Sequence, residues 1–292
     1  MSRFLIGIFF IVMVNFNGTI LKNSNVNIEE NRGFLFGDSV FETLKVLDNK
    51  VLFLEDHYFR LMASMRIFRM EIPMHFTMEF FEEQILLLVA TDTSTSNAFR
   101  VRFSVFRKDT GFYLPKTNDV SYLITAFPLE SELYFIKNGS YEVELYKDAY
   151  ITKQLFSSLK SNNKIIQITG SIFASENGFD NCLLLNDEKN VVEALQGNLF
   201  MRMGNTLITP PISDGCLNGI MRKQIISIAK KMKEYEVIEK SISPFDLQKA
   251  DELFITNVIM GIQPITKYRK KSFEINIAND LVMKLNAFIR LN

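Results

Sequence analysis

A glycine at an expected helix start is the feature of this sequence that most directly indicates a binding site. Prolines and an Asp-Gly pair at 210–215 are typical of a loop, and Asn218 is a good N-cap for an amphipathic helix expected over 219–232. The first amides of a helix have no carbonyl partner within the helix, so they bind anions readily. Gly219 would let a phosphate approach the backbone closely. By itself this indication is weak, because most helix starts bind only water.

Three charged residues could do chemistry but would not stand out by type alone. Lys160 follows a Ser-Ser-Leu stretch, Glu193 follows two valines on an expected strand, and Arg60 lies opposite Leu61 on an expected helix. Charged side chains of these types are nearly always solvated. The simplest interpretation of each is a surface charge, so a chemical role needs support from the surrounding sequence.

Several short motifs supply that support because they follow one another in a recognisable order. They are Asn31-Arg32-Gly33, Phe36-Gly37-Asp38-Ser39-Val40-Phe41-Glu42-Thr43, His57 with Arg60, Leu61 and Ser64, Leu159-Lys160 with Asn163, Glu193 with Gly197-Asn198-Leu199-Phe200, Thr209-Pro210-Pro211, Gly219-Ile220-Met221-Arg222 and Ala250-Asp251-Glu252-Leu253-Phe254. From about Met13 to Ile265 the chain resembles the class IV aminotransferases, the fold type IV pyridoxal-phosphate enzymes. Ser39 departs from the family pattern, which usually has glycine there.

The resemblance implies a fold, a cofactor and a set of roles. The fold would be α+β, a two-domain fold type IV enzyme similar to D-amino acid aminotransferase, and the cofactor pyridoxal 5′-phosphate. Lys160 would be the catalytic residue, carrying the cofactor as a Schiff base and then moving the proton. Glu193 would pair with the pyridine nitrogen and keep it protonated. The phosphate and the far side of the pocket would be bound by Arg60, Gly219, the amides of Ile220 and Met221, and the loop containing Asn257 and Val258.

Two activities of the family compete. Aminodeoxychorismate lyase releases pyruvate and leaves 4-aminobenzoate for folate biosynthesis, whereas an aminotransferase would act on branched-chain or D-amino acids with 2-oxoglutarate. Transaminases usually read Gly-Ile-Thr-Arg at the helix start, but Met221 resembles the Gly-Ile-Met-Arg of the lyase. The loop from Thr256 to Gly261 resembles the asparagine-containing loop of the lyase, and the Gly-Gly-Asn-Tyr of branched-chain transaminases does not follow Lys160. These three departures favour the lyase.

The substrate carboxylate has two candidate partners. Arg102 matches a strand position used in branched-chain transaminases, and Arg107 matches an arginine at the strand end in the lyase, which has a second arginine where this chain has Phe112. Either arginine could equally be a solvated charge on a strand. Phe41 and Ile259 complete the expected substrate-binding set.

A third hypothesis is a non-catalytic phosphate-binding or dimerising protein that kept the fold, since fold does not fix function. Such a protein would need neither Lys160 nor Glu193, so the presence of both counts against it. The resemblance also implies a homodimer that acts on a small-molecule amino substrate.

Composition restricts the remaining classes. The 292 residues, 47% apolar and 23% charged, are typical of a globular chain of up to two domains. The net charge is zero and no block of like charges occurs, so no nucleic-acid partner is expected. Two cysteines, Cys182 and Cys216, indicate a reducing, cytoplasmic setting, and with only two histidines no metal site is expected.

Periodicity and turn signals predict two domains, 13–127 and 133–292, the second bearing Lys160. The first domain should contain a hairpin at Asn17-Gly18, a hairpin joining 40–47 to 51–54, helices near 57–68 and over 76–91, and strands over 98–107 and 120–127. The second should contain helices over 163–175, over 219–232 and near the C-terminus, and strands near 141–145, 183–185, 191–192, 199–203, 207–209 and 253–256. Residues 1–12 are expected to be an N-terminal extension or a mis-assigned start, because their apolar run is too short to span a membrane and no membrane partner is expected.

Overall fold

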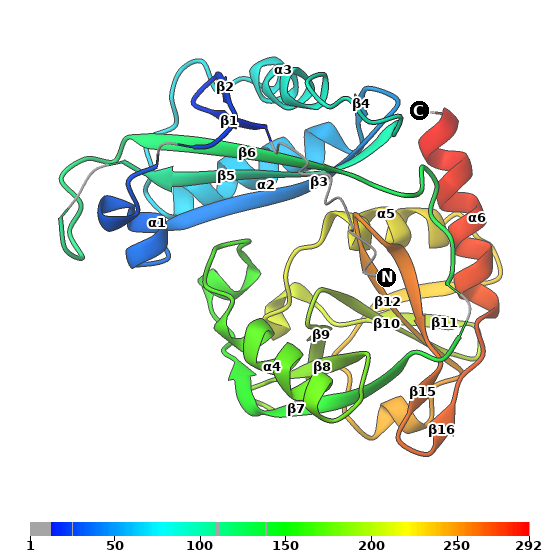
Figure 1. Ribbon diagram of the computed structural model, residues 1–292. Coiled ribbons are helices and arrows are strands. Elements are labelled where there is room, and N and C mark those ends of the chain that lie inside the picture. The colour runs from blue at the N-terminus through cyan, green and yellow to red at the C-terminus, as the bar shows by residue number, and fades with distance from the viewer. Residues whose placement is uncertain (1–12, 25, 109–110, 138, 292) are drawn as a thin grey trace, which may run out of the picture. The chain divides into compact units, whose positions relative to one another are not determined.

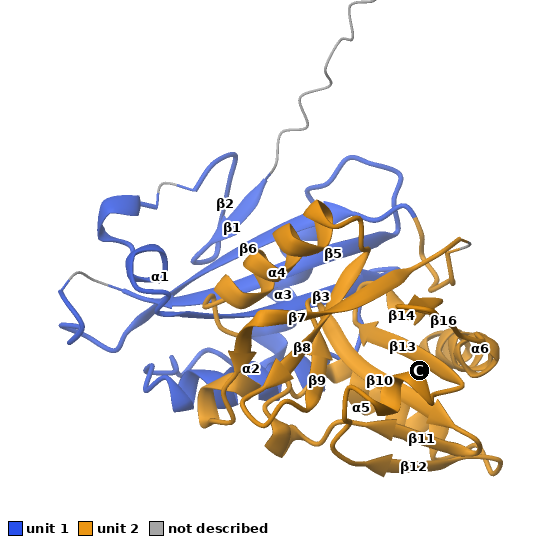
Figure 2. Cartoon of the chain, turned by 90° about the horizontal axis from the view of Figure 1, so that it is seen from below, with its two compact units in different colours: residues 1–130 blue, residues 131–292 orange. Residues whose placement is uncertain are grey.

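The chain divides into two compact units, residues 1–130 and 131–292, coloured separately in Figure 2. This computed structural model describes residues 13–24, 26–108, 111–137 and 139–291, so the expectation for residues 1–12 lies outside the described residues. Each unit contains its own sheet and its own buried apolar core. The mixture of hairpins and helices in both units confirms the α+β class (Figure 1).

The first unit is built on a six-stranded sheet in the order β2-β1-β6-β5-β3-β4, whose pairings are antiparallel. Both predicted hairpins are present. The turn residues Asn17, Gly18, Asp48 and Asn49 all have positive φ, which matches the right-handed twist of paired strands. The strands are β1 (Val14–Phe16), β2 (Thr19–Leu21), β3 (Ser39–Leu47), β4 (Lys50–Val51), β5 (Ala98–Arg107) and β6 (Val120–Pro128).

Two longer helices, α2 (Leu54–Ile67) and α3 (Met78–Val89), pack on one face of this sheet, and a short helix α1 (Arg32–Leu35) precedes β3. The predicted alternation of β5 is confirmed, because Phe99, Val101, Phe103 and Val105 are all buried in the core beneath the helices. The strand expected over 51–54 is wrong beyond residue 51. Phe53 has a φ of 56°, and this left-handed residue turns the chain into α2 at once.

The second unit contains a larger mixed sheet in the order β12-β11-β10-β9-β8-β7-β15-β16, with β13 and β14 joined through β10. Strand β10 is central because it pairs with β9, β11 and β13. The strands are β7 (Glu142–Ile151), β8 (Asn181–Asn186), β9 (Val191–Ala194), β10 (Gly197–Met203), β11 (Thr206–Thr209), β12 (Glu236–Glu239), β13 (Glu252–Asn257), β14 (Gly261–Ile265), β15 (Lys267–Tyr268) and β16 (Lys271–Ser272).

The helices of the second unit are α4 (Ile165–Glu176), α5 (Ile220–Ala229) and α6 (Asn276–Leu291). The motif residue Glu252 caps α6, because its carboxylate accepts the Ile277 amide at 3.0 Å and also binds Arg202 Nε at 2.9 Å. That motif therefore serves the fold. Across the described ranges, no helix combines the length and the apolar character needed to cross a bilayer.

Candidate active site

A tight hairpin brings two motif residues of the second unit onto one segment of chain. Strands β9 and β10 are joined through residues 195–196, so Glu193 pairs directly with Asn198 and their side chains share a face. Both bind Leu217, just before α5. The amide of Leu217 donates to Glu193 Oε2 at 2.9 Å, and Asn198 Nδ2 donates to the carbonyl of Leu217 at 2.8 Å. The spacing of Glu and Asn in the motif thus follows from the two-residue turn.

Glu193 is a buried carboxylate near two lysines. It is only 8% exposed. Burial raises the pKa of Glu193, while the Leu217 amide and the positive charges of Lys164 and Lys160 act in the opposite direction. A further cation beside this carboxylate would therefore stabilise its charged form, and Lys160 lies close enough for the two charges to interact.

Lys160 lies in the short connection between the 3-10 turn Leu155–Ser158 and helix α4. Its side chain is half-buried, whereas the following Ser161 is buried. Lys160 and Glu193 come from two different parts of the second unit, and the fold places them near enough for their charges to interact. Lys164, which sequence reasoning did not single out, joins them as the N-cap residue of α4.

The N-terminus of α5 has room only for a glycine at position 219. Gly219, and not Asn218 as expected, is the N-cap residue of α5. A Cβ at Gly219 would lie 1.8 Å from Asn198 Oδ1, so any larger residue would collide with that buried side chain. The amides of Ile220 and Met221 belong to the first turn, where the helix itself offers no carbonyl partner.

The arginine of the same motif is structural. Arg222 is 4% exposed, and its Nη2 donates to the carbonyl of Pro210 at 2.8 Å and to Glu239 Oε2 at 2.6 Å. These bonds fasten α5 to the preceding loop and to β12. Met221 is also buried, so the first turn of α5 offers backbone amides and a thioether but no side-chain hydroxyl.

The loop between β13 and β14 is organised by Asn257. Its Oδ1 accepts the amides of Ile259 at 3.0 Å and Met260 at 2.8 Å, and its Nδ2 donates to the carbonyl of Gln196 at 3.0 Å. The side chain of Asn257 is thus engaged in shaping the loop. Contact of this loop with a ligand would come from its backbone and from neighbouring side chains such as those of Val258 and Ile259.

In the first unit, Arg60 is held by a buried acid and is not the solvated charge of the simplest interpretation. Its Nε donates to Glu42 Oε1 at 2.7 Å and its Nη2 to Glu42 Oε2 at 2.5 Å, while His57 Nδ1 lies 2.8 Å from Glu42 Oε2. Burial raises the pKa of Glu42, but the charge and hydrogen bonds of Arg60 and His57 outweigh it and lower the pKa to about 2. Glu42 therefore fixes the orientation of the Arg60 guanidinium, which is the predicted phosphate ligand.

The two candidate carboxylate arginines lie on opposite faces of β5. Arg102 lies over the ring of Phe41, 3.5 Å from its centroid, so two predicted substrate-binding residues are brought together. Burial, with a smaller effect of Arg100, lowers the pKa of Arg102 to about 10. Arg107 instead faces a buried polar cluster, where it binds Asp38 Oδ2, Asn118 Oδ1 and the carbonyls of Phe68 and Arg69.

Sequence reasoning assigned no role to Glu42, Asn198 or Leu217. A signal for Glu42 was available, because its alternation with Val40 and Leu44 places an acid on the core face of β3, where a buried charge needs a partner. A signal for Asn198 was its position opposite Glu193 across a short turn. Leu217 acts only through its backbone, so its residue type carried no signal.

The residues of the second unit fit the expected cofactor. The first turn of α5 can bind phosphate through its amides, and Gly219 leaves room for close approach because no Cβ fits there. The buried carboxylate of Glu193 suits a protonated ring nitrogen, and Lys160 lies near enough to interact with it. The phosphate, the ring nitrogen and the aldehyde of pyridoxal phosphate therefore each have a suitable partner among these residues.

Comparisons with known proteins agree with this assignment. The family described as amino-transferase class IV matches residues 39–268. A Methanocaldococcus jannaschii protein named "Putative branched-chain-amino-acid aminotransferase" is 29% identical over 249 residues, which are 84% of this chain and 83% of that protein.

Two solved structures are similar to the whole chain. A branched-chain aminotransferase from Thermoproteus uzoniensis, with norvaline, has a TM-score of 0.82 at 24% identity, covering 93% of this chain and 92% of that one. A Legionella pneumophila protein titled "Putative 4-amino-4-deoxychorismate lyase" has a TM-score of 0.78 at 26% identity, covering 88% and 93%. The expected fold is thereby confirmed. Because the family match covers residues 39–268, which is most of its length, this chain belongs to the class IV aminotransferase family.

Proposed function

We propose that the protein is a pyridoxal 5′-phosphate enzyme that acts as an aminodeoxychorismate lyase, forming 4-aminobenzoate and pyruvate. The observation that carries this proposal is the buried Met221 in the first turn of α5, where transaminases usually offer a hydroxyl to the phosphate. The loop built around the Asn257 side chain is a second feature that resembles the lyase. The similarity to the Legionella structure supports the same activity.

The residues divide the chemical work between them. When bound, the cofactor supplies an electron sink for the carbon that bears the substrate amino group. Lys160 would hold the cofactor covalently, and its amine, once released by the substrate, would accept a proton from that carbon. Glu193 would keep the ring nitrogen protonated, and the amides of Ile220 and Met221 would bind the phosphate. A phosphate-binding role of Arg60, in the first unit, is proposed on the family resemblance alone. Loss of that proton and cleavage of the C–O bond to the three-carbon group would then form the aromatic ring of 4-aminobenzoate, and the released enol would take up a proton to become pyruvate.

Arg102 is proposed as the partner of the substrate carboxylate, in preference to Arg107. All three guanidinium nitrogens of Arg107 are engaged by acceptors of the first unit, so that residue already has a structural role. Arg102 lies on the other face of the sheet with Phe41, and its Nε donates to Ser104 Oγ at 3.0 Å. The cation–π contact with Phe41 would hold the Arg102 guanidinium in a fixed orientation for binding a carboxylate.

The second candidate function is a transaminase that acts on branched-chain or D-amino acids with 2-oxoglutarate. The similarity to the Methanocaldococcus protein favours it, and so does the choice of Arg102, which matches a strand position used in branched-chain transaminases. Both activities require the same cofactor, lysine and carboxylate. They differ in whether the substrate loses pyruvate or exchanges its amino group for a keto oxygen.

The test is to mix purified, cofactor-loaded protein with aminodeoxychorismate and follow 4-aminobenzoate by chromatography. The proposal expects catalytic release that is lost in Lys160→Ala. If the wild-type protein binds the cofactor and releases no 4-aminobenzoate, the lyase assignment is wrong. A panel of L- and D-amino acids with 2-oxoglutarate would then decide whether the transaminase takes its place.

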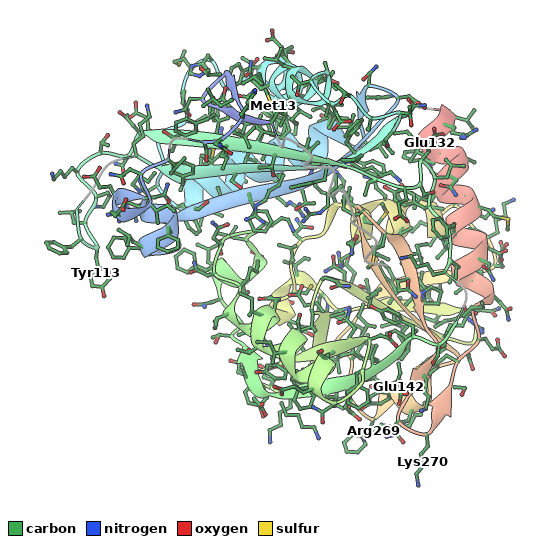
Figure 3. All side chains as sticks on the ribbon, in the orientation of Figure 1. Met13, Tyr113, Glu132, Glu142, Arg269 and Lys270 are labelled. Carbon is green, nitrogen blue, oxygen red and sulfur yellow. The ribbon has the colours of Figure 1, made fainter. Side chains whose placement is uncertain are left out.

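A homodimer in the cytoplasm is the proposed working form. The first unit exposes Phe112, Tyr113 and Leu114 in one loop, with Tyr113 labelled in Figure 3. The second unit exposes Ile165, Ile168 and Ile172 along one face of α4. Clustered apolar side chains of this size indicate a protein interface, and the proposed partner is a second copy of the chain. The cytoplasmic setting rests on the sparse cysteines, both of which are buried thiols.

A further inference from the structure

We propose that Asn198 is a positioning residue that holds Glu193 and the start of helix α5 in one fixed arrangement around the cofactor. The inference rests on the proposed function, because it assumes that Glu193 and α5 bind the two ends of pyridoxal phosphate. The family motif by itself assigns no role to Asn198. Its side chain is 4% exposed, so it acts through neighbouring protein groups.

Glu193 and Asn198 both form hydrogen bonds with Leu217. The facing residues Glu193 and Asn198 bind opposite sides of this one residue, the carboxylate at its amide and the Asn198 Nδ2 at its carbonyl. The carbonyl bond, at 2.8 Å, restricts rotation of the backbone at Leu217. The amide of Leu217 is thereby kept directed at Glu193 Oε2, 2.9 Å away.

The second contact of Asn198 is with Gly219. The Oδ1 atom of Asn198 occupies the space that a Cβ at Gly219 would need, only 1.8 Å from its ideal position. The same amide group therefore holds Leu217 through its nitrogen and defines the floor of the α5 start through its oxygen. One buried side chain thus links the carboxylate expected at the cofactor ring with the turn expected at its phosphate.

These contacts affect the charge of Glu193. Burial raises the pKa of Glu193, and the Leu217 amide is the hydrogen bond that opposes this effect. Loss of Asn198 would loosen Leu217 and weaken that bond. A carboxylate that takes up a proton more easily is a poorer partner for a protonated ring nitrogen, so both cofactor affinity and cofactor ionisation should change.

The experiment compares the full-length wild-type protein with Asn198→Ala, Asn198→Asp and Asn186→Ala. Asn198→Asp keeps the shape of the side chain but replaces the donor that faces the Leu217 carbonyl. Asn186→Ala is the matched control, because Asn186 is a fully buried asparagine of β8 that bonds Asp214, Glu188 and Asn190 and none of residues 217–219. The readouts are pyridoxal-phosphate affinity, pH titration of the visible absorbance of the bound cofactor, and melting temperature.

Both Asn198 variants should bind pyridoxal phosphate about tenfold more weakly and shift the pH at which its absorbance changes. The control should lower the melting temperature and leave both cofactor readouts unchanged. The inference is overturned if the Asn198 variants bind the cofactor and titrate like wild type, or if Asn186→Ala reproduces their changes. Failure of the wild-type protein to bind pyridoxal phosphate would instead overturn the proposed function.

A double-mutant cycle tests the contact between Asn198 and Gly219 directly. Gly219→Ala should weaken cofactor binding strongly in the wild-type background, because its Cβ meets Asn198. In the Asn198→Ala background the nearest remaining atom is the Arg222 Cβ at 3.4 Å, so the added loss should be much smaller. Additive losses would contradict the proposed contact.

Discussion

At the scale of single residues, some charged side chains of the first unit stabilise the fold, whereas others lie on the face of the sheet opposite the core. Arg107 is only 6% exposed and donates to four acceptors of its own unit. Arg102 lies against Phe41 on the other face of the same strand. The strand alternation that sequence reasoning used for the apolar residues of β5 therefore also distinguishes its two candidate arginines.

This distinction predicts different losses for the two glutamine variants. Arg102→Gln should raise the KM for the carboxylate substrate about tenfold with little change in melting temperature, because a charge-assisted contact is removed. Arg107→Gln should instead lower the free energy of unfolding by about 3 kcal/mol, since it removes a buried guanidinium that donates to four acceptors and leaves Asp38 with only one of its two arginine partners. Steady-state kinetics and chemical denaturation separate the effects, and the reverse pattern would assign the substrate to Arg107.

The buried group of Glu42, His57 and Arg60 predicts a specific acid sensitivity. The pKa of Glu42 is lowered from 4.5 to about 2, so its contribution to stability is fully present above pH 4.5 and is lost as the pH falls towards 2. Glu42→Gln should flatten the loss of stability over this interval while lowering stability at neutral pH. Unfolding curves at several pH values provide the measurement, and an unchanged acid slope in the variant would count against the pairing.

Sequence reasoning could select Arg60, Lys160, Glu193 and Gly219 as candidates because a motif order surrounds them, but it could not say which residues support them. Their supports come from distant segments: Glu42 lies 18 residues from Arg60, and Leu217 lies 24 residues from Glu193. Such pairs depend on which strands and helices pack together. Periodicity along the chain contains that information only in part: it places Arg60 opposite the Leu61 face of its helix but does not indicate its bonds to Glu42.

At the scale of elements, the loop between β13 and β14 is fixed from outside by Tyr134. The hydroxyl of Tyr134 donates to the carbonyl of Val258 at 2.7 Å. Its ring lies so close to Gly261 that a Cβ on this glycine would be only 2.7 Å from the nearest ring carbons. Its backbone exchanges hydrogen bonds with the side chain of Asn286 on α6. Burial raises the pKa of Tyr134, so the hydroxyl remains a donor at neutral pH. The loop is therefore tied to α6 through one residue.

Removing only that hydroxyl should loosen the loop and leave the packing in place. Tyr134→Phe is expected to raise the substrate KM several-fold and to reduce the free energy of unfolding by only about 1 kcal/mol. Tyr150→Phe, on the exposed part of β7, is the control and should change neither quantity. A Tyr134→Phe enzyme with wild-type kinetics would show that this bond does not position the substrate loop.

Elements with strong local signals were predictable, and those set by tertiary contacts were less so. The hairpin at Asn17-Gly18 and the helix after Thr77 follow from turn and cap chemistry, since Thr77 accepts the amide of Phe80. The N-cap of α5 is Gly219 and not the expected Asn218, and the Asn198 side chain, from a different strand, leaves room only for glycine at that position.

At the scale of the whole molecule, the proposed homodimer makes a direct prediction. Sedimentation or light scattering should give about twice the chain mass of 33.8 kDa, because the exposed apolar side chains of α4 and the 112–114 loop would be covered in a dimer. Ile168→Glu should shift the protein towards monomer, whereas Met283→Glu, at an exposed position on α6, should not. A wild-type protein that is monomeric at micromolar concentration would rule out this arrangement.

Borohydride reduction followed by peptide mass spectrometry can show whether Lys160 carries the cofactor. Reduction converts a lysine–cofactor Schiff base into a stable secondary amine, so the modified residue can be read from the fragments. Lys164 provides an internal comparison, because it also lies near Glu193. We expect one phosphopyridoxyl group on Lys160 and none on Lys164. Modification of Lys164 alone, or of no lysine in protein incubated with pyridoxal phosphate, would contradict the account.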